Sequence, residues 1–329
     1  LTTGARNTAI GYQVADSVTD GADNTVIGYN ALASAAGNET ANTAIGAYAM
    51  GSINHADSDD NIIIGKDAGQ GGAAAMIGCV AIGKDAMNST ASNAQTGTIA
   101  IGSSALTALT TGAANTAVGY QAGIAITTGG NNTAIGYQAL DGIDTATSNT
   151  AVGALAMSDA GNAHDKATEN VAIGFKAMAG TFTDSDVKYN VAVGTKAMQL
   201  GALNGLQYCT VIGNGAGKDL TSGSRSTLVG SLAGENITTG ENNVCIGASS
   251  GATLTTGGDH VLIGKNAGDV IAAGQTGTNG TIAIGTDALG ALTTANRCVG
   301  IGYQSLEDLT AGDSGTGHCT AVGYGSPQK

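Results

Sequence analysis

Three short segments of this sequence match parts of enzyme active-site motifs. Residues 247–251, Gly-Ala-Ser-Ser-Gly, match the G-x-S-x-G turn that carries a nucleophilic serine. Residues 312–315, Gly-Asp-Ser-Gly, match a serine-protease nucleophile region, and residues 213–218, Gly-Asn-Gly-Ala-Gly-Lys, match part of a phosphate-binding loop. None has its required context, because no helix can follow the first, the four His are widely separated, and the third lacks its Ser or Thr. We therefore expect that the chain is not an enzyme.

Acidic and histidine side chains gather in longer segments, at 52–60, 158–169, 179–189 and 306–318. Carboxylates are the ligands that Ca²⁺ prefers, so Asp57, Asp59 and Asp60, or Asp184 and Asp186, could bind that ion. The Gly/Asp nonapeptide of calcium-binding β-rolls is absent, so we favour solvated acidic loops and predict no cofactor and no metal site. Insertions in repeat proteins often form the binding face. The candidate binding-loop residues are Asp57, Asp59, Asp60, His164, Asp165, Asp184 and Asp186.

The five cysteines show no C-x-x-C spacing, which argues against a zinc site. Cys79, Cys209, Cys298 and Cys319 share one position of the repeat described below, and Cys245 occupies another. We favour buried thiols. Cys298 and Cys319 fall in consecutive copies, where the geometry also permits a bridge, and the sequence leaves this alternative open.

The composition excludes several classes of protein. The chain has 54 Gly, 1 Pro, no Trp and 2 Phe, so its apolar residues are mainly small or aliphatic and its core must be thin. A formal net charge of −13 argues against binding to nucleic acid or to anionic membranes. No run of 18 apolar residues is present, so we expect no membrane insertion. Because the sequence begins within a repeat, we expect a processed chain or a fragment of a longer fibre.

One repeat runs through the whole chain. Aligned on the glycine of an Ile-Gly or Val-Gly pair, it has 18 copies between Gly11 and Gly323, and eight of the 17 intervals are 17 residues long. We call this residue the anchor glycine. The residue before it is always Ile or Val, the residue three before it is Thr, Val or Ile, and the residue between these two is usually Ala. Alternating β-branched residues predict a short strand that ends at the anchor glycine.

A unit with one or two short strands cannot bury its apolar face alone, so the copies must stack. The fold prediction is an all-β, parallel β-solenoid, or β-roll, of about 18 coils with a 17-residue basic repeat. We expect residues 1–329 to form a single elongated domain. Both faces of the strand are apolar, so one must be covered from outside the coil. If the alanine face is the outer one, its flatness admits a second backbone, and we predict that the chain oligomerises along its length.

Two further columns of the repeat could bind ligands or stabilise the scaffold. Six tyrosines and Phe175 follow an anchor glycine, and we favour mutual stacking over a sugar-binding strip. The position four before the glycine is Asn in ten copies, and we favour a structural ladder of stacked amides over a row of ligand-binding amides. These residues are Asn7, Asn24, Asn42, Asn61, Asn115, Asn132, Asn149, Asn170, Asn190 and Asn243.

The phrases NTAIG, NTAVG and NVAIG, followed by a small residue and Ala, resemble the head repeats of trimeric autotransporter adhesins and related phage tail-fibre proteins. The resemblance spans Asn7 to Gly323 and implies a left-handed β-roll, three chains packed side by side, and attachment to a surface. The coil is longer than the usual coil of that family, so we expect an extra turn or short strand. This chain shows no heptad stalk or membrane anchor, and no functional residue is carried over.

The function we predict is structural: a rigid fibre or adhesin element that presents loops on a repeat scaffold, located outside the cell, on a cell surface or on a virion. The expected partners are copies of the same chain, with a trimer favoured, and a cell-surface receptor or glycan. A self-assembling filament subunit that stacks end to end is the alternative. An ice-binding rod ranks third, because Val or Ile interrupts the Thr column in half of the copies.

Overall fold

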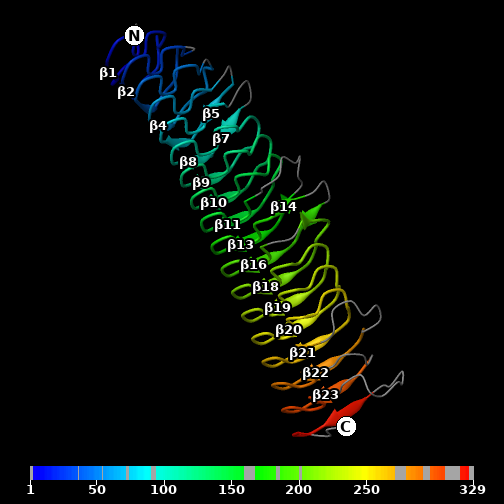
Figure 1. Ribbon diagram of the computed structural model, residues 1–329. Coiled ribbons are helices and arrows are strands. Elements are labelled where there is room, and N and C mark those ends of the chain that lie inside the picture. Colours follow the sequence, from blue (N-terminus) through cyan, green and yellow to red (C-terminus); the bar gives the residue numbers. More distant parts are fainter. Residues whose placement is uncertain are drawn as a thin grey trace. The chain divides into compact units, whose positions relative to one another are not determined.

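The structure is a computed structural model that describes residues 3–35, 37–53, 55–71, 74–89, 94–158, 167–182, 186–199, 202–270, 279–291, 297–307 and 319–325. These residues form strands and turns and no helix. Contacts within the chain divide it into two units, Leu1–Ala167 and Thr168–Lys329. In each unit the chain winds as a parallel β-solenoid, which confirms the predicted fold class (Figure 1). The single-domain expectation and the handedness stay predictions.

Every anchor glycine directly follows a three-residue strand. The first unit has β1 (Thr8–Ile10), β2 (Thr25–Ile27), β3 (Thr43–Ile45), β4 (Ile62–Ile64), β6 (Val80–Ile82), β8 (Ile99–Ile101), β9 (Thr116–Val118), β10 (Thr133–Ile135) and β11 (Thr150–Val152). The second unit has β13 (Val171–Ile173), β16 (Val191–Val193), β18 (Thr210–Ile212), β19 (Thr227–Val229), β20 (Val244–Ile246), β21 (Val261–Ile263), β22 (Ile282–Ile284), β23 (Val299–Ile301) and β24 (Thr320–Val322).

Several of the longer coils add two-residue strands, whereas the 17-residue coils that the structure describes throughout have turns in their place. The two-residue strands are β5 (Met76–Ile77) and β7 (Gln95–Thr96) in the first unit, β14 (Thr181–Phe182), β15 (Val187–Lys188) and β17 (Ala202–Leu203) in the second, and β12 (Ala167–Thr168) at the boundary. β5 pairs with β7 and β14 with β17, in parallel. The segment that follows each anchor glycine consists of turns.

Within each unit, consecutive three-residue strands pair in parallel and in register. Between β10 and β11, for example, Thr133 pairs with Thr150, Ala134 with Ala151 and Ile135 with Val152. Between β18 and β19, Thr210 pairs with Thr227 in the same way. Because the register is constant, each column of the repeat becomes a ladder of similar side chains.

The strands turn their central residue inward and their flanking residues outward. Ala44, Ala134 and Leu228 are buried, whereas Ile135 and Ile212 keep 39% and 40% of their surface exposed. The alternative in which alanine forms the outer strip is therefore wrong. The coil interior is narrow and is filled by a small residue on the strand together with a large one from the following turn, and this leaves the Ile and Val column outside.

The volume of the coil interior is balanced between two positions, the central strand residue and the residue four after the anchor glycine. Ala134 is matched by Leu140, and both are buried. Leu228 is matched by Gly234, where an added Cβ would lie 2.9 Å from Leu228 Cδ2. Three other coils of the described chain pair Ile63, Val211 and Leu262 with a glycine in the same way, while β2 combines Val26 with Leu32 and β9 combines Ala117 with Gly123. Close packing explains this exchange, because two large residues would overfill most coils.

The anchor glycine combines a bend with a close approach of two backbones, as the sequence predicts. Gly136 has a φ of 137°, and a Cβ at this position would lie 2.5 Å from the carbonyl oxygen of Gly153 in the next coil. Residues with a side chain rarely adopt this φ, and the carbonyl leaves no room for a Cβ. Glycine is therefore required on both grounds.

Candidate functional site

The asparagine column forms a ladder of hydrogen bonds inside the coils. The Asn132 backbone N–H donates to Asn115 Oδ1 over 2.9 Å, and its Nδ2 donates to the same oxygen over 3.0 Å and to the Ala146 carbonyl over 2.7 Å. Asn149 repeats the pattern with Asn132 Oδ1 and the Ala167 carbonyl. The side-chain amide thus links the start of each strand to the turn of the next coil. The amide itself is buried, and its polar atoms are hydrogen-bonded.

Other members of the column make equivalent contacts. In the first unit, the side chains of Asn7, Asn24, Asn42 and Asn61 donate to carbonyls of the following coil; in the second unit, Asn170, Asn190 and Asn243 do the same. Where another residue replaces Asn, the backbone half of the ladder persists. The Cys209 and His260 N–H groups donate to Asn190 and Asn243 Oδ1 over 3.0 and 3.1 Å.

The acidic loop residues that the structure describes contact their own scaffold. Asp59 Oδ1 accepts a hydrogen bond from the Thr40 N–H over 2.6 Å, and Asp186 pairs with Lys188 over 2.9 Å. Asp57 Oδ2 lies 3.9 Å from His55 Nδ1. Asp60 has a φ of 61°, in the left-handed region of a turn. In the described ranges, no three His, Cys, Asp or Glu side chains gather as metal ligands would. Three of the predicted residues, His164, Asp165 and Asp184, lie outside the described residues.

Two of the three segments that match catalytic motifs lie in the described part of the chain, and both are turns of the repeat. Ser249, in 247–251, has a φ of 55°, and its N–H donates to the Ser231 carbonyl of the preceding coil. In 213–218, Gly215 and Gly217 also have positive φ, and Lys218 pairs with Glu235 over 3.6 Å. Residues 312–315 lie outside the described part of the chain. The two described segments therefore follow the repeat geometry, with no strand-to-helix elbow after Ser249.

Exposed tyrosines stack between consecutive coils. The ring centroids lie 5.6 Å apart for Tyr12 and Tyr29 and for Tyr120 and Tyr137, and 5.2 Å apart for Tyr303 and Tyr324, with nearly parallel planes. This is the stacking that the column after the anchor glycine predicts. The rings face one another along the ladder.

Two tyrosine contacts involve residues outside the predicted column. Tyr189 and Tyr208 stack at 5.1 Å, and Tyr48 meets Tyr29 edge to face. The signal for the stacked pair was present, since both residues stand five positions before an anchor glycine in consecutive copies. Both adopt a positive φ, of 61° and 59°, in a column that elsewhere often holds Gly, Asn or Asp.

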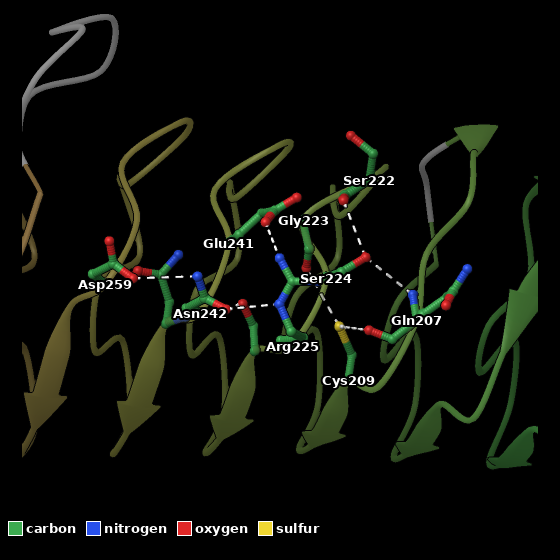
Figure 2. A network of polar contacts seen from close by, with 11 residues as sticks. Gln207, Cys209, Ser222, Gly223, Ser224, Arg225, Glu241, Asn242 and Asp259 are labelled. Carbon is green, nitrogen blue, oxygen red and sulfur yellow. Dashed lines mark hydrogen bonds and ion pairs between the residues drawn. The ribbon is translucent and has the colours of Figure 1, made fainter.

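The same corner of the second unit carries a chain of polar contacts (Figure 2). Arg225 Nε donates to Asn242 Oδ1 over 2.9 Å, and Asn242 Nδ2 donates to Asp259 Oδ1 over 3.2 Å. Arg225 also pairs with Glu241. These exposed residues satisfy one another along the ladder. Exposed contacts of this kind contribute about 0–1 kcal/mol each, so they stabilise the corner weakly.

Burial keeps three of the thiols almost entirely protonated near neutral pH. It raises the pKa of Cys209 to about 11 and that of Cys245 to about 12, and it also raises the pKa of Cys79. The thiolate is the reactive form of cysteine. These three residues therefore fill space in the coil interior.

One surface of each unit remains available for binding, and we call it the outward strip. It consists of the two outward columns of the three-residue strands together with the residue after the anchor glycine. In the first unit, Ile10, Ile62, Ile135 and the stacked tyrosines are exposed on it; in the second unit, Ile173, Phe175, Ile212, Ile246, Ile301 and Tyr303 are exposed.

Comparison with known proteins assigns no family to this chain. It matches no known protein family, no curated protein and no solved structure. The parallel β-solenoid is therefore established from the structure of the chain itself, and the resemblance to adhesin heads and tail fibres stays a prediction. No helix among the described residues is long and apolar enough to cross a membrane.

Proposed function

We propose that this chain is a structural and attachment protein, an element of a rigid extracellular fibre or adhesin that works as a homo-oligomer. The resemblance in the NTAIG phrases favours a trimer on a cell surface or virion. The observation that supports the proposal is the outward strip, whose columns of Ile, Val and Thr repeat along the strands of each unit and are flanked after the anchor glycine by tyrosines and, in some coils, by lysine. A receptor or glycan would then be bound by the longer loops.

The outward strip repeats in every coil of a unit, which favours a partner that covers it. Each strand contributes an Ile or Val and, beside it, a Thr, Val or Ile. The strip continues over the nine three-residue strands of one unit, whereas the largest apolar patch of a typical monomer covers about 300–600 Å². A standard interface buries about 800 Å² per partner, so a second copy of the chain could cover the strip.

The chemistry of the strip favours the same chain as its partner. Parallel sheets normally have both faces covered, and here the coil interior covers one. The uncovered side chains are β-branched and regularly spaced by the strand register, and a matching surface exists on every copy of the chain. Closed oligomers are built from such repeated surfaces.

Electron microscopy of the purified chain tests this proposal. A fibre element of closed symmetry should give discrete particles of one length, each containing several chains. Open-ended filaments would instead favour the end-to-end subunit, and single-chain particles at micromolar concentration would rule out both modes of assembly.

A further inference from the structure

Two cysteines of the second unit stand in the same column of consecutive coils. Cys298 directly precedes β23 and Cys319 directly precedes β24. The register pairs Val299 with Thr320, and the Val299 N–H donates to the Cys319 carbonyl over 2.7 Å. Adjacent strands lie about 4.8 Å apart. A disulfide spans Cα separations of about 4.4–6.8 Å, so the backbone geometry permits one here.

The two side chains also meet. Burial raises the pKa of Cys298 to about 11, and a side-chain hydrogen bond with Cys319 is among the further causes. Cys298 is fully buried, whereas Cys319 is partly exposed. One thiol is therefore accessible to a small reagent, and the other lies next to it inside the coil.

We propose that Cys298 and Cys319 form a disulfide site that joins the consecutive coils of β23 and β24. The oxidant is a low-molecular-weight disulfide of the glutathione class, which an oxidising extracellular setting would supply. The site needs only these two side chains and that oxidant, so it does not depend on the proposed fibre function.

The reaction balances as two thiol–disulfide exchanges. The Cys319 thiolate attacks the small disulfide, which forms a mixed disulfide and releases one small thiol. Cys298 is mostly protonated near neutral pH, so it reacts through its small thiolate fraction, which attacks the adjacent Cys319 sulfur, forms the bond between the coils and releases the second small thiol. The two protons lost by the cysteines pass to the two leaving groups, and the small disulfide is reduced.

The other three cysteines serve as internal controls. Cys79 stands between Asn61 and Thr98 in its column, Cys209 stands between Asn190 and Ser226, and Cys245 pairs in register with Leu228 and Leu262. None of them has a cysteine in the adjacent coil, and all three are buried. The geometry therefore selects one pair out of the five thiols.

Incubation of the intact folded chain with oxidised glutathione tests the site. After free thiols are blocked and the chain is digested, mass spectrometry should find a peptide pair linked through Cys298 and Cys319, two hydrogens lighter than its parts. Cys79, Cys209 and Cys245 should remain thiols. Hydrogen exchange at the Val299 amide should slow severalfold on oxidation. Recovery of Cys298 as a thiol in the native chain, or a glutathione adduct that persists on Cys319, would overturn the proposal.

Two variants sharpen the outcome. Cys298→Ser should stop the reaction at the Cys319–glutathione adduct, while Cys209→Ser should leave the linked pair unchanged. If Cys298→Ser does not fold, the presence or absence of the linked peptide pair in the unmodified chain still tests the proposal.

Discussion

Exchanging the sizes of Leu228 and Gly234 probes the packing inside one coil of the second unit. Leu228 is fully buried, and its Cδ1 and Cδ2 would lie 2.8 and 2.9 Å from a Cβ at Gly217 and at Gly234. The double variant Leu228→Ala with Gly234→Leu reproduces the combination in the β8 coil, where Ala100 is matched by Leu106. Backbone strain should not prevent this, because Leu106 has a φ of 50° and Gly234 one of 56°.

Each single change should destabilise the chain for a different reason. Leu228→Ala removes a buried side chain and leaves a cavity, which costs about 2–5 kcal/mol. Gly234→Leu overfills the coil, because its Cβ alone would meet Leu228 and lie 2.8 Å from Ile237 Cδ1. Overpacking costs about 1–3 kcal/mol. If the two effects were independent, the double variant would lose at least about 3 kcal/mol.

We expect the double variant to remain within about 1.5 kcal/mol of the unmodified chain, because the interior volume is restored. Urea unfolding of all four proteins measures this. Hydrogen exchange at the Gly234 amide, which donates to Ser250, reports on the same coil locally. A double variant that loses as much as the two single variants together would refute the idea of a shared interior volume.

Three further predictions concern single positions. Asn132→Asp places a carboxylate beside Asn115 Oδ1 and removes the donor to Ala146, so chemical unfolding should show a loss of about 3–5 kcal/mol. Gly136→Ala should lose more than about 4 kcal/mol in the same assay, whereas Gly97→Asn, where a Cβ meets nothing within 4 Å, should change stability by less than about 0.5 kcal/mol. Burial, and to a smaller extent the charge of Asp287, raises the pKa of Asp269 above its value in the unfolded chain. The protonated Asp269 side chain therefore stabilises the fold in acid, and this stabilisation is lost as the pH rises through the raised pKa. Asp269→Asn should therefore match the unmodified chain at about pH 3 and unfold at a higher urea concentration at about pH 7, and equal midpoints at both pH values would contradict this.

Much of this fold can be read from the sequence, because each column of the repeat has one physical role. The Ile or Val before the anchor glycine marks the strand, and the anchor glycine marks the bend and the close backbone approach seen at Gly136. Which strand face points inward could not be read. The alternating pattern defines two faces of the strand, but both faces are apolar. Which face points inward is decided by the volume of the coil interior, which holds Ala134 together with Leu140, or Leu228 together with Gly234.

The candidate binding residues were harder to predict than the scaffold. The Asn132 amide lies in a column, and its contacts follow from the register. The loop residues lie in insertions that do not repeat, so the register between coils does not determine their contacts. Asp59, for example, accepts a hydrogen bond from the Thr40 N–H, and no sequence pattern indicates this contact. Tyr189 and Tyr208 stack at the corner before the strand, in a column where only these two consecutive copies hold a tyrosine, so the column as a whole does not predict stacking.

Sedimentation of the purified chain at micromolar concentration tests the central claim, that the outward strip is covered by further copies of the chain. The unmodified protein should sediment as a discrete species of several chains. Replacing Ile135 and Ile212 together by lysine should shift it to a single chain, because each lysine places a charge in the Ile and Val column, which holds no charged residue in the unmodified chain. Asn131→Lys, at an exposed corner outside the strip, should leave the assembly intact. A folded, unmodified chain that sediments as a monomer would contradict the account.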